Sequence, residues 1–261
     1  MKRDDRQQAI MDLLVAEGTV ELDALAERFA VSRMTIHRDL DELEGAGLLR
    51  KVRGGATIQS GTRFESDFRF RERQNAGAKA AMSRAALDLI EPGMTVMIND
   101  GSMTAVLGQM LPQKRPLTVI TNNAAVIDAL KAESGVTLIA LGGTYSAKYN
   151  AYLGKLTEDA LATLRADIAF ISTPAVMGLE TFHMDDSVVQ SKRRMMDQAT
   201  MRVLVVNHTR FGQAALYRLA ALDEFDHIIT DALPAEDARK ALDAKGIALT
   251  IATQDPEKAT A

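Results

Sequence analysis

The apolar positions of the first 58 residues predict three short helices followed by a hairpin. Residues 5–17 and 22–29 carry apolar side chains at helical spacing, and Gly18 separates the two patterns. Ser32 is a good N-cap for a third helix, whose apolar positions are Met34, Ile36, Leu40 and Leu43. Residues 48–53 and 56–58 indicate two strands joined by a turn at Gly54-Gly55. The pattern therefore predicts a small N-terminal domain of residues 1–58.

Residues 59–76 differ in composition from what precedes them, and we predict a linker there. The stretch begins Gln59-Ser60-Gly61-Thr62 and continues with alternating charges and three phenylalanines, Phe64, Phe68 and Phe70. Phenylalanines argue against a fully disordered tether, so we expect part of this linker to dock onto a neighbour.

From Ala78 onward, short apolar runs recur, each bounded by polar residues or glycine, with helical patterns between most of them. The runs are 96–98, 118–120, 137–141, 168–171, 203–206, 227–229 and 248–251. Near-continuous apolar strands separated by helices indicate a mostly parallel sheet that is covered on both faces. We therefore predict an α/β domain over residues 77–252, followed by a C-terminal tail of residues 253–261.

The composition excludes several kinds of chemistry. The chain has 261 residues and no cysteine, so disulfides, thiolate metal sites and cysteine catalysis are excluded. The histidines and acids show no metal-ligand spacing, and we expect no metal and no cofactor. No apolar stretch follows the charged N-terminus as in a secretory signal, and no run approaches the roughly 20 residues of a membrane helix. We therefore expect a soluble, cytoplasmic protein that does not associate with membranes.

The formal net charge of −4 argues against DNA binding, but the cations are concentrated locally. Six lie within one short stretch: Arg28, Arg33, Arg38, Arg50, Lys51 and Arg53. The acids of that stretch sit together between residues 39 and 44. A footprint on DNA needs positive charge on one face and not over the whole protein.

Three short helices and a hairpin are the parts of a winged helix-turn-helix. In that module the helix after the tight turn lies in the major groove, and its N-terminal residues face base edges. Ser32, Arg33, Thr35 and His37 could then bond to bases or phosphates, Arg38 could neutralise a phosphate, and Met34 and Ile36 would face the core. The wing would place Arg50, Lys51 and Arg53 against the backbone or the minor groove. On charge alone, a three-helix domain with a solvated basic face stays open as an alternative.

Three of the predicted strands end in polar or glycine residues that suit a ligand. In parallel α/β sheets, ligands bind beyond the carboxyl ends of the strands. The candidates after the first three runs are Asp100, Gly101, Ser102 and Thr104, then Thr121, Asn122 and Asn123, then Gly142 and Gly143. Gly101 permits close backbone approach, hydroxyls bond to ligand oxygens, and helix N-termini favour anions. Together these ends predict a phosphate-and-polyol pocket.

The segment from Arg6 to Leu40 resembles the N-terminal signature of the DeoR family of bacterial transcription regulators. Arg6 and Ile10 open the resemblance, and the nine residues Ser32-Arg33-Met34-Thr35-Ile36-His37-Arg38-Asp39-Leu40 close it at the family's spacing. Residues 47–56 are similar to the family's wing. The resemblance implies sequence-specific binding to a double-stranded DNA operator.

Residues 75–252 resemble the sensor domain of the same family, at Lys79, at the strand ends named above, at Gly154, at Lys192 and over residues 207–212. The resemblance implies a fold related to ribose-5-phosphate isomerases and the sensing of phosphorylated sugars. It places Asp100, Ser102, Thr104, Asn122, Lys192 and Arg210 in the effector pocket. This chain departs from the family pattern at Asn99, Met103, Asn207 and Arg210, so its effector could differ from an ordinary sugar phosphate. Alternatively, Lys192 is exposed to solvent as part of the cationic run 192–194 and does not touch the ligand.

We therefore expect a repressor of a sugar or polyol catabolic operon that a small phosphorylated sugar releases from DNA. Binding to paired half-sites favours a homodimer or homotetramer. A sugar-phosphate isomerase-like enzyme with an added N-terminal domain is the alternative, since the fold alone does not decide function. Asp100 could serve as its base, but the loops that isomerases of this fold use are not evident. A pure protein-interaction module is a third possibility, which the recognition-helix motif disfavours.

Overall fold

The computed structural model describes residues 2–58 and 67–252. The chain divides into two compact units between Gln74 and Asn75. Each unit has its own apolar core.

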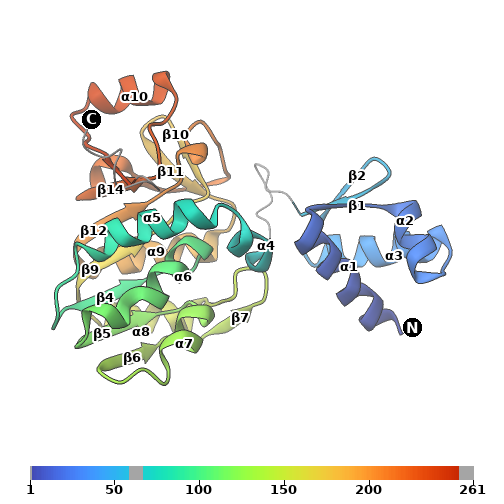
Figure 1. Cartoon of the computed structure of the whole chain (residues 1–261), viewed down its shortest axis with the longest axis horizontal. Helices are drawn as coiled ribbons and strands as arrows, with labels where there is room; N and C mark the ends of the chain where they lie inside the picture. The colour runs from blue at the N-terminus through green and yellow to red at the C-terminus, as the bar shows by residue number, and fades with distance from the viewer. Residues whose placement is uncertain (1, 59–66, 253–261) are drawn as a thin grey trace. The chain divides into compact units, whose positions relative to one another are not determined.

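The N-terminal unit is built of four helices and a small antiparallel sheet in the described residues (Figure 1). Its helices are α1 (Arg3–Glu17), α2 (Leu22–Phe29), α3 (Arg33–Gly45) and α4 (Phe68–Arg73). Its strands are β1 (Thr19–Glu21), β2 (Arg50–Val52) and β3 (Gly55–Thr57), in the spatial order β1-β3-β2. The three predicted helices and the hairpin are confirmed. Strand β1 was not predicted, because three residues are too short to show an alternating pattern.

The core of this unit confirms most of the apolar positions of α3 and corrects one. Ile36 and Leu40 are fully buried and pack in one cluster with Ile10 and Leu14 of α1. The prediction that Met34 faces the core is wrong, because its side chain is 62% exposed. Positions two residues apart are separated by about 200° around the helix axis, so Met34 lies almost opposite Ile36.

Part of the segment that we assigned to a linker is helical. Residues Phe68–Arg73 form α4, and Ala76 begins the first helix of the next unit. Phe70 packs against the N-terminal core, and Arg69 Nη1 lies 3.1 Å from the Asp12 carboxylate of α1. Residues 67–74 therefore belong to the N-terminal unit instead of a linker. Phe64 and the stretch Gln59-Ser60-Gly61-Thr62 lie outside the described residues, as does the tail 253–261.

The second unit contains a sheet of seven parallel strands within the described residues, in the order β15-β14-β12-β9-β4-β5-β6. The strands are β4 (Thr95–Ile98), β5 (Leu117–Thr121), β6 (Val136–Ala140), β9 (Ala166–Ile171), β12 (Ala199–Val205), β14 (His227–Thr230) and β15 (Thr250–Ile251). Each of the seven predicted apolar runs corresponds to one of them, so the prediction of a parallel α/β sheet is confirmed.

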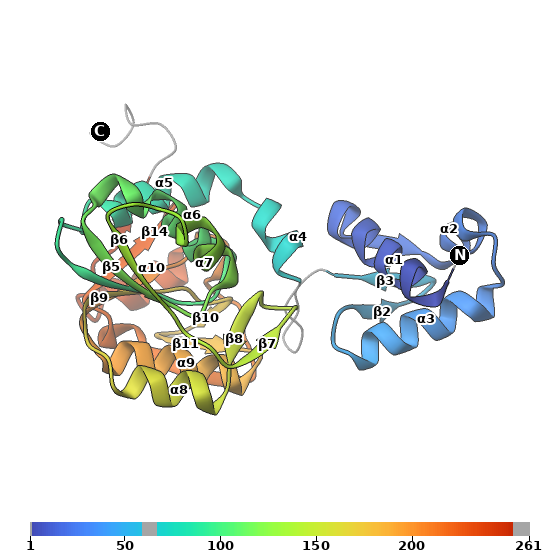
Figure 2. The ribbon, with the colours of Figure 1, turned by 90° about the horizontal axis from the view of Figure 1, so that it is seen from below.

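Helices cover both faces of this sheet (Figure 2). They are α5 (Ala76–Leu87), α6 (Ser102–Met110), α7 (Ala124–Leu130), α8 (Lys155–Ala162), α9 (Asp186–Asp197) and α10 (Glu236–Asp243). Figure 2 shows α5, α6 and α7 on one face and α8 and α9 on the other. Met195 and Met196 of α9 are buried in the apolar core that this helix shares with the sheet.

Two small antiparallel elements were not predicted. Strands β7 (Thr144–Ser146) and β8 (Ala151–Leu153) form a hairpin. Strands β10 (Ala175–Met177), β11 (Glu180–His183) and β13 (Tyr217–Ala221) form a second sheet. These strands have three to five residues and mixed burial, so their local sequence carries little pattern.

The order of strands in the large sheet reverses beside β4. From β4 the chain proceeds through β5 to β6 on one side, and β9, β12, β14 and β15 lie on the other. In open α/β sheets, ligands bind outside the carboxyl ends of the strands at such a switch point. The loops after β4 and β9 therefore form the candidate ligand site of this unit.

Candidate functional site

Helix α3 begins with a well-formed N-cap. The Ser32 hydroxyl accepts a hydrogen bond from the Thr35 backbone N–H at 3.2 Å, as its sequence position predicted. The Ser32 and Thr35 hydroxyls also lie 3.0 Å apart. This cap fixes where the helix starts and thus which side chains occupy its first turn.

A buried ion pair holds α3 against α1. Arg6 Nε and Nη2 donate to the two carboxylate oxygens of Asp39 at 2.5 and 3.0 Å. The two side chains are 9% and 2% exposed. The side-chain hydrogen bond to Asp39 raises the pKa of the Arg6 guanidinium above its ordinary value, despite the opposing effect of burial. Such a two-pronged bond restricts the orientation of α3 in both distance and angle.

The six cations of the basic stretch fall into two groups. Arg33 Nε lies 2.8 Å from the Asp23 carboxylate of α2, and Lys51 pairs with Asp41 of α3. Four others are exposed and form no ion pair among residues 2–58 and 67–252: Arg28, Arg38, Arg50 and Arg53. His37 is also exposed on α3. These side chains are free to meet phosphates, whereas Arg33 and Lys51 must first leave a carboxylate.

The wing is attached to α3 by the same lysine. The Lys51 backbone N–H donates to Glu44 Oε1 at 2.7 Å, and its ammonium pairs with Asp41. The acids of α3 therefore orient the β2–β3 hairpin, a role that the charge pattern alone did not suggest.

At the switch point of the large sheet, the loops after β4 and β9 are bonded to each other. Asn99 Oδ1 accepts from the Ser172 backbone N–H at 3.2 Å, and Asn99 Nδ2 donates to the Asp100 carbonyl. Asn99 is fully buried. Its Oδ1 joins the two loops, as an aspartate oxygen could, whereas the bond from its Nδ2 to the Asp100 carbonyl needs a donor that an aspartate would lack.

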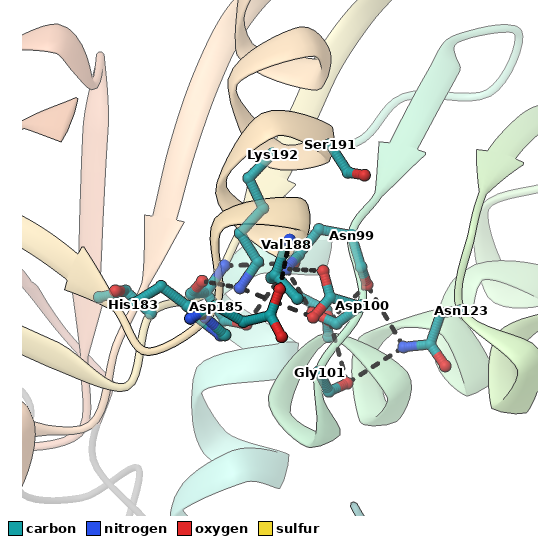
Figure 3. A network of polar contacts seen from close by, with 12 residues as sticks. Asn99, Asp100, Gly101, Asn123, His183, Asp185, Val188, Ser191 and Lys192 are labelled. Carbon is teal, nitrogen blue, oxygen red and sulfur yellow. Dashed lines mark hydrogen bonds and ion pairs between the residues drawn. The ribbon is translucent and has the colours of Figure 1, made fainter. Parts of the chain in front are cut away.

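Lys192 of α9 reaches into this junction (Figure 3). Its ammonium donates to the Ser172 carbonyl at 2.9 Å and lies 3.8 Å from Asp100 Oδ2. Both charged side chains are only 2% exposed. The separation of 3.8 Å is too long for a direct hydrogen bond, so two ammonium hydrogens have no protein acceptor among the described residues. We call Asn99, Asp100, Ser172 and Lys192 the switch-point cluster.

The hydroxyl and amide groups around this cluster mostly hold the backbone. Thr104 Oγ1 donates to the Asn99 carbonyl at 2.9 Å, and Thr121 Oγ1 donates to the Ile98 carbonyl at 2.7 Å. Asn123 Nδ2 donates to the carbonyls of Asn99 and Gly101 at 3.3 and 3.1 Å, and its Oδ1 caps α7. In the structure these three side chains bond to the backbone of the loops, and their predicted contact with a ligand stays a prediction.

Asn122 is different, because one end of its amide is unused. Its Nδ2 donates to the Tyr152 carbonyl at 3.0 Å, while its buried Oδ1 has no hydrogen-bond partner among the described residues. A buried acceptor without a donor is costly, so this oxygen offers a bonding position to a ligand or to water.

Two of the predicted glycines are required by close contacts. Gly101 has φ of 130°, and a Cβ there would lie 2.6 Å from Ser172 Oγ. A Cβ at Gly143 would clash with Thr157 Oγ1 and the Leu153 carbonyl. Gly142 contributes its carbonyl, which accepts from Thr157 Oγ1 at 2.7 Å. Ser102, which is buried, begins α6 directly after Gly101.

Arg210 lies on the loop after β12, the next strand beyond β9 at the same edge of the sheet. Asp231, after β14, fixes this loop by accepting from Asn207 Nδ2 and from the His208 N–H, each at 2.8 Å. The loop therefore depends on a neighbouring strand end for its shape.

Sequence reasoning missed Ser172, which bonds to both Asn99 and Lys192. It directly follows the fourth apolar run, so the rule applied to the first three strand ends would have found it. Within the described residues there is no group of three or more histidines, cysteines or acids that could hold a metal ion. None of the described helices is both long and apolar enough to cross a membrane.

Comparison with known protein families identifies both units. The description of the DeoR C terminal sensor domain matches residues 74–232, and that of the DeoR-like helix-turn-helix domain matches residues 6–62. This chain belongs to the DeoR family. It is a DeoR-family DNA-binding transcription regulator, and the predicted winged helix-turn-helix and sensor domains are confirmed as its parts.

Curated relatives span nearly the whole length of this DeoR-family chain. An uncharacterised helix-turn-helix regulator, YgbI of Escherichia coli, is 32% identical over 253 residues, which is 96% of this chain and 98% of the relative. The L-fucose operon activator of Haemophilus influenzae is 30% identical and covers 87% and 91% of the two chains. The glycerol-3-phosphate regulon repressor of Escherichia coli is 27% identical and covers 90% and 93%.

Among solved structures, ribose 5-phosphate isomerase A from Methanocaldococcus jannaschii aligns with 53% of this chain and 55% of its own. The identity is 16% and the TM-score 0.40. We draw no functional argument from so distant a similarity.

Proposed function

We propose that this regulator represses a sugar or polyol catabolic operon and that a small phosphorylated sugar releases it from its operator. The observation that carries the proposal is the switch-point cluster, in which the buried ammonium of Lys192 has unused donors and lies 3.8 Å from Asp100, two residues before the start of α6. The relatives named after the glycerol-3-phosphate regulon and the fucose operon support a sugar-related effector. One is named an activator and the other a repressor, and release of the operator by the effector in a binding assay tests the proposed repression.

The cluster suits a ligand that has both an anionic group and hydroxyls. The N-cap of α6 is Gly101, which has no side chain to bond to the first-turn N–H groups, and a helix start attracts anions. Lys192 would supply the opposing positive charge. Asp100 would accept hydrogen bonds from ligand hydroxyls, because a carboxylate repels a phosphate. Asn122 Oδ1 would accept one more, and Arg210, Gly142 and Gly143 would lie at the rim.

A thermal-shift screen of phosphorylated sugars and polyols tests the effector. A compound at about 100 times its dissociation constant should stabilise the protein by roughly 2.7 kcal/mol. We propose that the sensor unit folds alone, so a fragment starting at Asn75 should bind the same compound and fail to bind DNA. Because the fragment lacks the N-terminal unit, a thermal shift that it shares with the full chain shows that the compound binds the sensor unit. A stable, folded protein that no compound shifts would refute the sugar-phosphate proposal.

We propose that α3 enters the major groove, that Ser32, Arg33, Thr35 and His37 contact it there, and that Arg38, Arg50, Lys51 and Arg53 bond to the backbone. Support comes from the exposed cations along α3 and the wing and from the family assignment. Paired half-sites would require a homodimer or homotetramer, since a single module reads only one half-site. Acting on chromosomal DNA, the protein would work in the cytoplasm.

Replacement of Arg38 by alanine should weaken binding to every DNA sequence about equally. If Arg38 neutralises one phosphate, the slope of log affinity against log salt should fall by about 1. The measurement is affinity for a selected and a random duplex at several salt concentrations. Glu27→Ala, on the exposed surface of α2, is the control and should leave the slope unchanged. An unaltered slope for the Arg38 variant would exclude the phosphate contact.

We propose that the sensor unit binds its effector without converting it, in contrast to the isomerase-like alternative. The support is that both matching families are regulator domains. A coupled isomerase assay on the full chain with the compound found in the screen would detect any turnover.

A further inference from the structure

Met34 is an apolar side chain in an unexpected place. Of the large apolar side chains exposed within the described residues, it is the one that lies on α3, and it is 62% exposed. Its helical position is almost opposite the buried stripe of Ile36 and Leu40. The capped helix start therefore presents a methionine, away from the core, in the turn that faces base edges in a helix-turn-helix.

The neighbouring Arg33 is held by a carboxylate, which it must leave before it can meet a base. Arg33 pairs with Asp23 of α2 at 2.8 Å, which draws its guanidinium to the side of the helix. Arg38 lies one turn beyond Met34 on the same outward face and has no ion-pair partner among residues 2–58 and 67–252. The centre of the outward face thus offers a flexible apolar side chain with a cation behind it.

The major groove presents one kind of apolar group, the C5 methyl of thymine. We propose that Met34 is a specificity-determining residue that contacts a thymine methyl in each operator half-site. The inference rests on the proposed placement of α3 in the major groove. A methionine suits this contact, because its unbranched, polarizable thioether adapts to an apolar surface.

Removal of the methyl group from DNA tests the contact. Duplexes are selected with the full-length protein from a random-sequence library, and each thymine is then replaced in turn by deoxyuridine. For the unmodified protein, the replacement at one position per half-site should weaken binding about fourfold, the equivalent of about 0.8 kcal/mol for one buried methyl group. For Met34→Ala, the same replacement should change the affinity by less than about 1.5-fold.

Three further variants separate the possible outcomes. Met34→Leu should keep the methyl effect, because it keeps an apolar side chain of similar size. Val52→Ala, which shortens the exposed apolar side chain of the wing, should keep it as well. Arg38→Ala should weaken all duplexes but preserve the ratio between thymine and deoxyuridine.

The proposal is overturned if no thymine of the selected duplexes shows the effect, or if the effect persists in Met34→Ala or is lost in Val52→Ala. If the protein binds DNA sequence-selectively but shows no methyl effect, the role of Met34 is refuted and the proposed DNA recognition is not. A protein that selects no sequence at all would refute the proposed DNA recognition and this inference with it.

Discussion

Replacement of Asp39 by alanine is expected to destabilise the N-terminal unit by about 3–5 kcal/mol and to abolish DNA binding. The substitution leaves the Arg6 guanidinium buried without its carboxylate, and an uncompensated buried charge costs that much. Hydrogen exchange of backbone amides in α1 and α3 measures the effect, because it reports the free energy of local opening. Exchange there should accelerate on the order of 100-fold or more, while the sheet of the second unit stays protected.

The matched control is Asp23→Ala, which removes the carboxylate of the exposed Arg33–Asp23 pair. The two side chains of this pair are each 69% exposed, so loss of the pair should change the free energy of unfolding by less than about 1 kcal/mol. The double variant Arg6→Met, Asp39→Leu removes both charges and should restore most of the stability. Equal, small effects of Asp39→Ala and Asp23→Ala would show that the buried pair does not hold α3 in place.

Replacement of Lys192 by methionine is expected to weaken effector binding about 100-fold while leaving operator binding without effector intact. Methionine fills much of the same space but cannot donate to the ligand, and the loss of a buried, charge-assisted hydrogen bond costs roughly 2–5 kcal/mol. The regulator would then remain on its operator at effector concentrations that release the unmodified protein. Operator binding measured without the compound from the screen gives the affinity for DNA. The same measurement at increasing concentrations of the compound gives the apparent affinity for the effector.

Arg194→Met is the control for this experiment, since Arg194 lies two residues away on α9 and is exposed. It should respond to the effector like the unmodified protein. Lys192→Met also leaves Asp100 buried without a cation, so the double variant with Asp100→Asn separates lost recognition from lost folding. A wild-type response in Lys192→Met would place the pocket elsewhere. Loss of operator binding in both Lys192 variants would instead indicate a structural lysine.

Local pattern determined much of the fold. A strand buried on both faces must be apolar at nearly every position, so the inner strands of the large sheet were visible as runs such as Ile168-Ala169-Phe170-Ile171. The start of α3 could also be predicted from the local sequence, because the N-cap bond joins Ser32 to Thr35 within one turn. The family resemblance likewise rested on short motifs and was confirmed.

Other features depend on which distant segments become neighbours, and only the tertiary structure decided them. Met34 fits a helical apolar pattern, but α1 and α2 contact the face that carries Ile36 and leave Met34 exposed. In the cationic run 192–194, the packing of α9 buries Lys192 and leaves Arg194 exposed. Ser172 meets Asn99 because β9 pairs with β4, although 73 positions separate them in the chain. Apolar periodicity indicates which positions of an element are suited to burial. Strand order and helix packing determine which of them are buried and against which segments they pack.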